Sequence, residues 1–263
     1  MGTNETPVLG KPAHMSDAEW EVRVELAAAY RVLDWYGWNE TIFNHITARV
    51  PGPERHFLIN PFGLWYDEVT ASNLVKIDLA GNAVGPASYG INRAGFIIHS
   101  AVHAARDDAH CIMHTHTTTG MAIACRREGL KHDDFYGAML IGRVAYHDFE
   151  GITVHAEEQP RLVKNLGDRH VMILRNHGLL VAERDIAHAF ALLWTLQRAC
   201  DVQCQSEAIG GYDLPLADSV RESCRNDALH FDVDGGTCRR MFEATVRRME
   251  RVMRGPGWID YRS

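Results

Sequence analysis

Apolar and polar residues alternate along the chain in patterns typical of helices and of strands. Helical patterns, most of them with apolar residues three to four positions apart, are found at residues 20–36, 92–106, 118–127, 157–166, 185–207 and 237–254. Short apolar or alternating runs bounded by turn residues predict strands at residues 41–50, 57–60, 74–79, 111–116, 144–147, 171–174 and 178–182. Because the two kinds of element are interleaved, we expect an α/β fold.

Several residues mark the ends of these elements. Ser16 and Glu19 have the spacing of a capping box before the first helix, and Asp185 is a capping residue for the long helix that follows it. A further short helix is expected at residues 70–74 and a loop at residues 212–220. We expect three parts in all: a flexible N-terminal arm (1–15), one domain (16–211), and a C-terminal loop and helix that pack on the domain or on a neighbouring subunit (212–263).

Two strand ends carry candidate metal ligands. The apolar run from Cys111 leads into His114 and His116, which project on the same side of an extended chain because side chains alternate. His177 follows another apolar run and precedes a glycine. Three histidines with one position left open are typical of a catalytic rather than a structural metal site. The chain has 15 histidines, however, so solvated histidines at strand ends are the alternative.

A second histidine pair lies within one predicted helix. His99 and His103 are four residues apart and therefore share a helix face. Such a pair can bind a metal ion, but no glutamate completes a His-Glu-x-x-His motif here. A polar helix face packed on a neighbouring element is the alternative.

Composition narrows the class of protein. The chain has 263 residues, 46% hydrophobic and 23% charged, with a net charge of -7. This balance gives no basic surface for nucleic acid or an anionic membrane. No apolar run has the length of a membrane span or the form of a signal peptide, and the six cysteines include no Cys-x-x-Cys pair. We therefore expect a cytoplasmic protein with reduced thiols.

Several motifs in order resemble the class II aldolase/adducin family, and particularly its branch near the adducin head domain. The similarity covers roughly residues 20 to 210, and the matching blocks are residues 44–49, 57–63, 92–106, 114–116, 144–147 and 175–178. The resemblance implies a three-layer α/β/α sandwich around a mostly antiparallel central sheet. It also implies a homo-oligomer, typically a tetramer with active sites between subunits.

The resemblance assigns roles to individual residues. His114, His116 and His177 match the three metal-binding histidines, which implies a divalent ion; zinc is the first expectation, with manganese and iron as alternatives. The family's proton-donating tyrosine, which reaches the neighbouring subunit's site, falls at Phe135 or Tyr136, and Tyr136 is the candidate.

Other family residues are missing. The metal-binding glutamate on the preceding helix falls at Gly95, and the phosphate-binding serines just before it are absent. The Gly-Asn pair of the first phosphate loop is replaced by Asn44-His45. Loss of the glutamate removes the usual proton-transfer group. Arg93 offers a cation suited to a carboxylate, and Asn92 and Asn44 are further candidates for binding substrate.

Three functional hypotheses follow. The first is a metal-dependent lyase of aldolase or decarboxylase type, which cleaves a C–C bond of a small organic acid through a metal-stabilised enolate, with Tyr136 or His99 moving protons. The second is a non-haem metal oxygenase, since three histidines leave open positions on iron. The third is a non-catalytic, adducin-like interaction module, which the missing glutamate favours. We expect no nucleic-acid or membrane partner.

Overall fold

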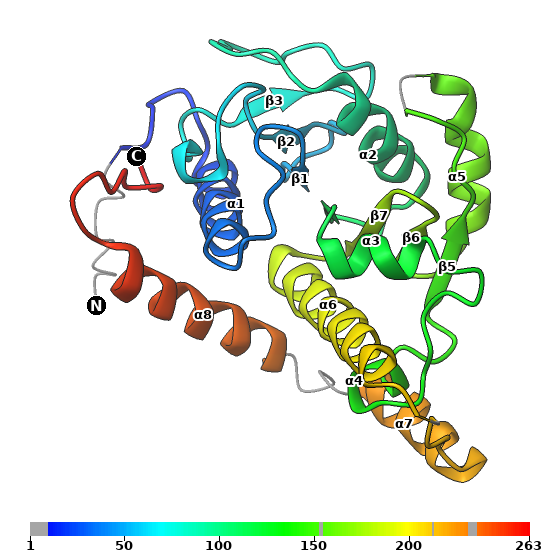
Figure 1. Ribbon diagram of the computed structural model, residues 1–263. Coiled ribbons are helices and arrows are strands. Elements are labelled where there is room, and N and C mark those ends of the chain that lie inside the picture. Colours follow the sequence, from blue (N-terminus) through cyan, green and yellow to red (C-terminus); the bar gives the residue numbers. More distant parts are fainter. Residues whose placement is uncertain (1–9, 153–154, 212, 231–235) are drawn as a thin grey trace.

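A seven-stranded sheet forms the middle layer of the computed structural model, which describes residues 10–152, 155–211, 213–230 and 236–263 (Figure 1). The strand order is β3-β2-β1-β4-β7-β6-β5, and every neighbouring pair is antiparallel except β5 and β6, which are parallel. The strands are β1 (His45–Arg49), β2 (Phe57–Ile59), β3 (Val75–Ile77), β4 (Cys111–Thr115), β5 (Val144–His147), β6 (Val171–Leu174) and β7 (Gly178–Glu183).

Helices cover both faces of this sheet. They are α1 (Asp17–Trp35), α2 (Arg93–Ala105), α3 (Thr118–Ala124), α4 (Phe135–Ala138), α5 (Gln159–Leu166), α6 (Ile186–Ile209), α7 (Asp218–His230) and α8 (Thr237–Met253), with 3-10 helices at Tyr66–Glu68 and Ala156–Glu158. Helices α2 and α5 lie on one face, and α1 and α6 lie on the other (Figure 1). The predicted three-layer α/β/α sandwich with a mostly antiparallel sheet is confirmed.

Alternate side chains of β4 belong to two hydrophobic cores, one on each face of the sheet. Ile112 packs with Ile98 of α2 and Leu162 of α5, whereas Met113, one residue later, belongs to the cluster formed with α1 and α6. All these side chains are buried. Strands that are apolar on both faces are expected where helices cover both sides of a sheet.

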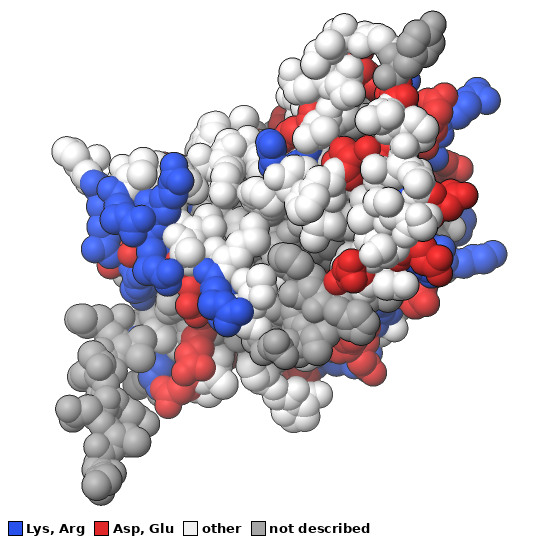
Figure 2. All heavy atoms as spheres, turned by 90° about the horizontal axis from the view of Figure 1, so that it is seen from below, with Lys and Arg blue, Asp and Glu red and all other residues white. Residues whose placement is uncertain are grey.

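Helix α8 is an amphipathic cover over α1 and α6. Its inner side buries Phe242 and Met249, and the Phe242 ring lies 5.5 Å from that of Phe190 in α6. Its outer side carries Arg247, Arg248 and Arg251, all exposed. Positive side chains gather at this end of the molecule when it is seen from below (Figure 2). Phe242 and Met249 are therefore core residues, whereas Met253 at the end of the helix is 38% exposed.

Two local predictions were wrong. The short helix expected at residues 70–74 is a turn, in which Asn73 accepts a hydrogen bond from the Thr70 amide and Thr70 accepts one from the Asn73 amide. Side chains that bond to nearby backbone in this way compete with helix formation. The loop expected at 212–220 gives way to α7 at Asp218; the sequence reading missed this helix because it is mostly polar.

The sequence also predicted a flexible N-terminal arm and the boundaries of the domain. Residues 1–9 of the expected N-terminal arm and Tyr212 lie outside the described residues. The boundaries proposed at 16–211 and 212–263 stay predictions. Among the helices that the structure describes, none is both long and apolar enough to span a bilayer.

Replacement of Phe242 by alanine should lower the free energy of unfolding by about 3 kcal/mol, because it removes a buried ring between α8 and α6. Urea unfolding followed by circular dichroism would measure this change. Val252→Ala on the same helix, where the side chain is 61% exposed, is the matched control and should change the value by less than about 0.5 kcal/mol. Equal effects of the two substitutions would contradict the packing described for α8.

Candidate metal centre

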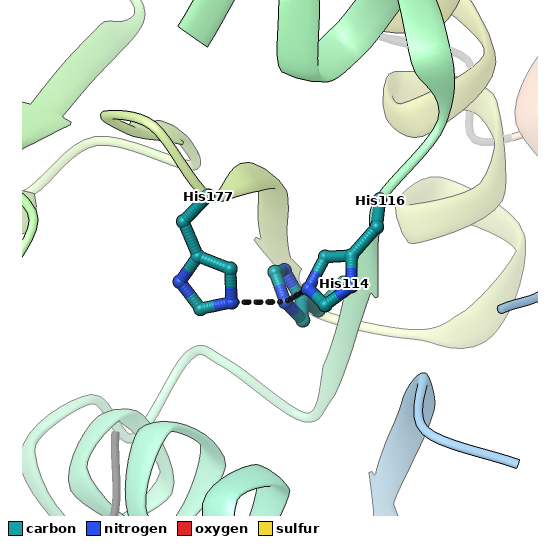
Figure 3. A group of neighbouring side chains, drawn as sticks. All are labelled: His114, His116 and His177. Carbon is teal, nitrogen blue, oxygen red and sulfur yellow. Dashed lines mark hydrogen bonds between the residues drawn. The ribbon is translucent and has the colours of Figure 1, made fainter. Parts of the chain in front are cut away.

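Three imidazole rings converge at one end of the central strands. His114 lies near the end of β4, His116 follows that strand, and His177 immediately precedes β7. The Nε2 atom of His114 is 2.8 Å from Nε2 of His116 and 3.3 Å from Nε2 of His177 (Figure 3). The structure thus brings together the three histidines selected from the sequence, with candidate ligand atoms all within 4.8 Å of one another.

The backbone between β6 and β7 explains how His177 reaches this point. Asn176 has a φ of 56°, in the left-handed region, so the chain turns sharply before β7 pairs with β4. A Cβ atom on Gly178 would lie 2.4 Å from the carbonyl oxygen of Thr115. The His-Gly corner is therefore a steric requirement, since only glycine allows β7 to approach β4 so closely beside His177.

Hydrogen bonding and burial prepare the rings to bind a cation. The Nδ1 of His114 donates to the carbonyl oxygen of Leu179 at 2.8 Å, which leaves the lone pair on Nε2. Burial lowers the pKa of His114 well below 6.5 and lowers the pKa of His177 to about 4. Burial also lowers the pKa of His116, while the negative charge of Glu40 opposes that shift. The rings are therefore neutral at physiological pH, as metal ligation requires.

The distances between the nitrogens fit one small metal ion. Two nitrogens bound to tetrahedral zinc at about 2.0–2.1 Å lie about 3.3 Å apart. The His114–His177 separation of 3.3 Å meets this value, and the His114–His116 separation of 2.8 Å needs a shift of about half an ångström. Because His116 and His177 are only half-buried, the site keeps an open side.

A polar network fixes the segment after His116. Thr117 accepts a hydrogen bond from the Gly120 amide, caps α3, and donates to Oε1 of Gln197 in α6 at 2.6 Å. The amide of Gln197 donates in turn to Thr119 at 2.7 Å. The chain that leaves the site is thus held to the helix beneath it.

His99 and His103 belong to a buried chain of hydrogen bonds. Nδ1 of His103 donates to the carbonyl oxygen of Ala109 at 3.1 Å, so its Nε2 accepts from the Thr47 hydroxyl at 2.8 Å. The Thr47 oxygen then accepts from Nδ1 of His99 at 2.7 Å. His103 therefore packs on neighbouring strand β1, the alternative considered for this pair. The Nε2 atom of His99 is left without a hydrogen-bond partner among the described residues.

The predicted substrate-binding residues have different surroundings. Arg93 is exposed at the first residue of α2. Asn92 caps that helix through the Ala94 amide and donates to the carbonyl oxygen of Phe43 at 3.0 Å, so its side chain is engaged in structural contacts. Asn44 is 1% exposed, and neither polar atom of its side chain has a hydrogen-bond partner within the described ranges.

Tyr136 lies apart from the three histidines within one chain. Its ring packs on Trp194 of α6 at 5.6 Å and beneath Arg198 at 5.5 Å, partly buried against the core cluster on the α1 and α6 side of the sheet. The sequence reading placed this tyrosine in a neighbouring subunit's site. That role stays a prediction.

The structure adds His45, which sequence reasoning recorded only as a departure from the family pattern. It pairs with His114 across β1 and β4, and the two ring centroids are 5.3 Å apart. A Cβ atom on Gly95 would lie 1.5 Å from Cδ2 of His45. The imidazole thus fills the space where the expected glutamate side chain would begin. The available sequence signal was the joint occurrence of His45 at a strand start and glycine at position 95.

The chain belongs to the class II aldolase/adducin family. The model of the class II aldolase and adducin N-terminal domain matches residues 24–204. A Caulobacter vibrioides protein, provisionally named a class 2 aldolase, is 40% identical over 99% of this chain and 100% of its own length. Rat alpha-adducin is 47% identical over 72% of this chain, which spans only 26% of that longer protein.

Solved structures agree with this assignment. An aldolase II superfamily protein from Pseudomonas syringae superposes with a TM-score of 0.87 and 44% identity, covering 95% of this chain and 98% of that one. The L-fuculose 1-phosphate aldolase of Glaciozyma antarctica PI12 superposes with a TM-score of 0.77 and 26% identity, covering 92% and 94% of the two chains.

Mild acid should destabilise the metal-free protein through its buried histidines. Burial lowers the pKa of His103 to about 3 and that of His99 well below 6.5. The unfolded chain takes up protons at these positions below about pH 6.5, whereas the folded chain does not. The free energy of unfolding should therefore fall as the pH drops below 6.5, by about 1 kcal/mol per pH unit for each histidine.

Urea unfolding in EDTA between about pH 7.5 and pH 5 would measure this dependence. His103→Gln should give a shallower slope than the unsubstituted chain, because one titrating group is removed. An unfolding free energy that stays constant across this range would contradict the assignment of neutral, buried rings.

Proposed function

We propose that this protein is a metal-dependent carbon-carbon lyase, of aldolase or decarboxylase type, that acts on a small organic acid. The observation that carries the proposal is the convergence of three neutral imidazoles on one point with an open side. The similarity to an L-fuculose 1-phosphate aldolase over 92% of the chain supports a lyase. Gly95 and the exposed cation of Arg93 favour a carboxylate over a sugar phosphate.

The chain's own residues supply binding and orientation. His114, His116 and His177 would hold a divalent ion, with zinc expected first and manganese or iron as alternatives. Such an ion acts as a Lewis acid toward a carbonyl oxygen. Arg93 stands at the N-terminus of α2, where the helix dipole adds to its attraction for a carboxylate. Proton transfer is assigned to Tyr136 of a neighbouring subunit or to His99. A homotetramer and a cytoplasmic location stay predictions.

A second candidate is a binding module without catalysis. The identity of 47% to rat alpha-adducin across 72% of this chain favours it. So does the absence of a carboxylate side chain at position 95. This reading predicts that the three histidines have no use for a metal ion, and the measurement of metal content therefore separates it from the lyase.

Purified protein should hold about one divalent metal ion per chain, and His114→Ala/His116→Ala should lose it, because two of three ligands are removed. Elemental analysis after dialysis gives the measurement. His14→Ala/His110→Ala removes two exposed histidines and is the matched control, which should keep the metal. Zinc or manganese would favour the lyase, and iron would favour an oxygenase. If the protein is purified without metal and binds none of the ions on incubation, the non-catalytic binding module becomes the favoured function.

A screen for C–C cleavage should find turnover among 2-oxo and 2-hydroxy acids rather than sugar phosphates. Arg93→Ala should raise KM for such an acid by about tenfold through loss of a charged contact, with little change in metal content. Arg143→Ala, at a half-buried arginine on the other side of the sheet, is the control. Turnover of phosphorylated sugars alone would overturn the organic-acid assignment.

A further inference from the structure

The His45 ring lies beside the candidate metal centre and fills the space that a side chain at position 95 would need. It is 3% exposed, and its ring lies between that of His114, with centroids 5.3 Å apart, and that of His99, at 4.6 Å. Any Cβ on Gly95 would fall within 2.1 Å of two atoms of this ring. His45 and Gly95 therefore form a matched pair, in which the glycine is needed because the imidazole is present.

The neighbouring rings carry two ring nitrogens without hydrogen-bond partners. Nδ1 of His45 and Nε2 of His99 are both buried, and neither has a partner among the described residues. The hydrogen bonds through Thr47 commit Nδ1 of His99 as a donor, so its Nε2 can only accept. Buried polar atoms without partners are costly. Nε2 of His99 therefore calls for a bound group with a hydrogen-bond donor, which the hydroxyl of a 2-hydroxy acid would supply.

Among the described residues, the side chains packed against His114 are uncharged rings. The rings in contact with His114 are those of His45, His116 and His177. The carboxylate whose charge reaches this group is Glu40, which acts on His116 and is itself exposed. A divalent ion held by three neutral imidazoles keeps nearly its whole charge, which favours an anionic ligand with oxygen donors over an uncharged one.

We propose that His45 is a specificity-determining residue that fits the centre to a small chelating carboxylate, a 2-oxo or 2-hydroxy acid. Its imidazole fills the space that a side chain at position 95 would occupy, so the side of the centre next to Gly95 carries no charge. The bound acid would lie against this ring. The proposal deepens the proposed function and rests on it, since it requires a metal ion on the three histidines.

The test uses the full chain loaded with Co²⁺, whose visible spectrum responds to a change in its ligands. Oxalate is the charged probe and glycolamide the uncharged one. The unsubstituted protein should bind oxalate with a spectral change and discriminate against glycolamide. His45→Glu should weaken oxalate by about tenfold or more, because it adds a negative charge beside the ion. His45→Gln, which stays uncharged, should keep oxalate affinity within about threefold.

Gly95→Ala offers an independent test that does not touch the histidine itself. The added Cβ displaces the His45 ring, so the Co²⁺–oxalate spectrum should change. Gly90→Ala is the control: it lies just before the same helix, nothing stands within 4 Å of its added Cβ, and its spectrum should not change. Circular dichroism of each variant establishes that it is folded. Should His45→Glu fail to fold, His45→Ala/Gly95→Ala should be more stable than Gly95→Ala, since removal of the ring makes room for the Cβ.

The outcomes separate this proposal from the function on which it rests. Failure of the unsubstituted protein to bind Co²⁺ would overturn both. Binding of Co²⁺ without preference for oxalate over glycolamide would overturn the role of His45 alone. So would oxalate affinities and spectra that are the same in His45→Glu, Gly95→Ala and the unsubstituted protein.

Discussion

The antiparallel pairing of β4 with β7 is the constraint on which the arrangement of this molecule depends. It sets His114 opposite Leu180 and leaves His177 at the point where the chain enters β7. The Leu179 carbonyl that fixes the tautomer of His114 belongs to the same ladder. Gly178 lets the two strands approach closely at this end. A shift of one residue in register would turn His114 to the opposite face and disperse the centre.

The surroundings of the centre follow from the layers around that ladder. Side chains alternate along β4, so Ile112 and His114 face α2 while Met113 faces α6. The same rule in β1 turns His45 and Thr47 toward α2, where His99 and His103 contact them. Three elements, β1, β4 and α2, thus contribute histidines to one polar seam between the sheet and α2. Within it, Nδ1 of His45 and Nε2 of His99 have no hydrogen-bond partner among the described residues.

Local patterns in the sequence were sufficient for the strands, most helices and the three converging histidines. His-x-His places two rings on one side of a strand by geometry alone. The position of His45 could not be predicted in this way, because it depends on a strand register and on a close approach to Gly95 from an element 50 positions later in the chain. The separation of Tyr136 from the centre likewise depends on which face of the sheet its short helix covers.

Helix α7 and the turn at residues 70–74 show the limits of periodicity. In α7 few apolar residues mark a buried face, and Arg221 ties the helix to the domain by donating to Asp133 at 2.6 Å. At 70–74 distant residues add to the local Thr70–Asn73 bonds: guanidinium groups of Arg23 and Arg31 donate to carbonyl oxygens of Val69, Ala71 and Leu74. These carbonyl oxygens accept hydrogen bonds from arginine side chains instead of from backbone amides four residues later, as they would in a helix.

The hydrogen-bond chain from Ala109 through His103 and Thr47 to His99 has a single direction. A backbone carbonyl can only accept, so this one oxygen decides the orientation of every dipole that follows it. Reversal would require all the protons of the chain to move together and would leave that oxygen unpaired. The hydrogen-bonded part of the seam is therefore a row of dipoles with one fixed orientation, and Nε2 of His99 at its end is left to accept a proton. This row of dipoles presents the candidate metal centre with an electric field that is set when the chain folds.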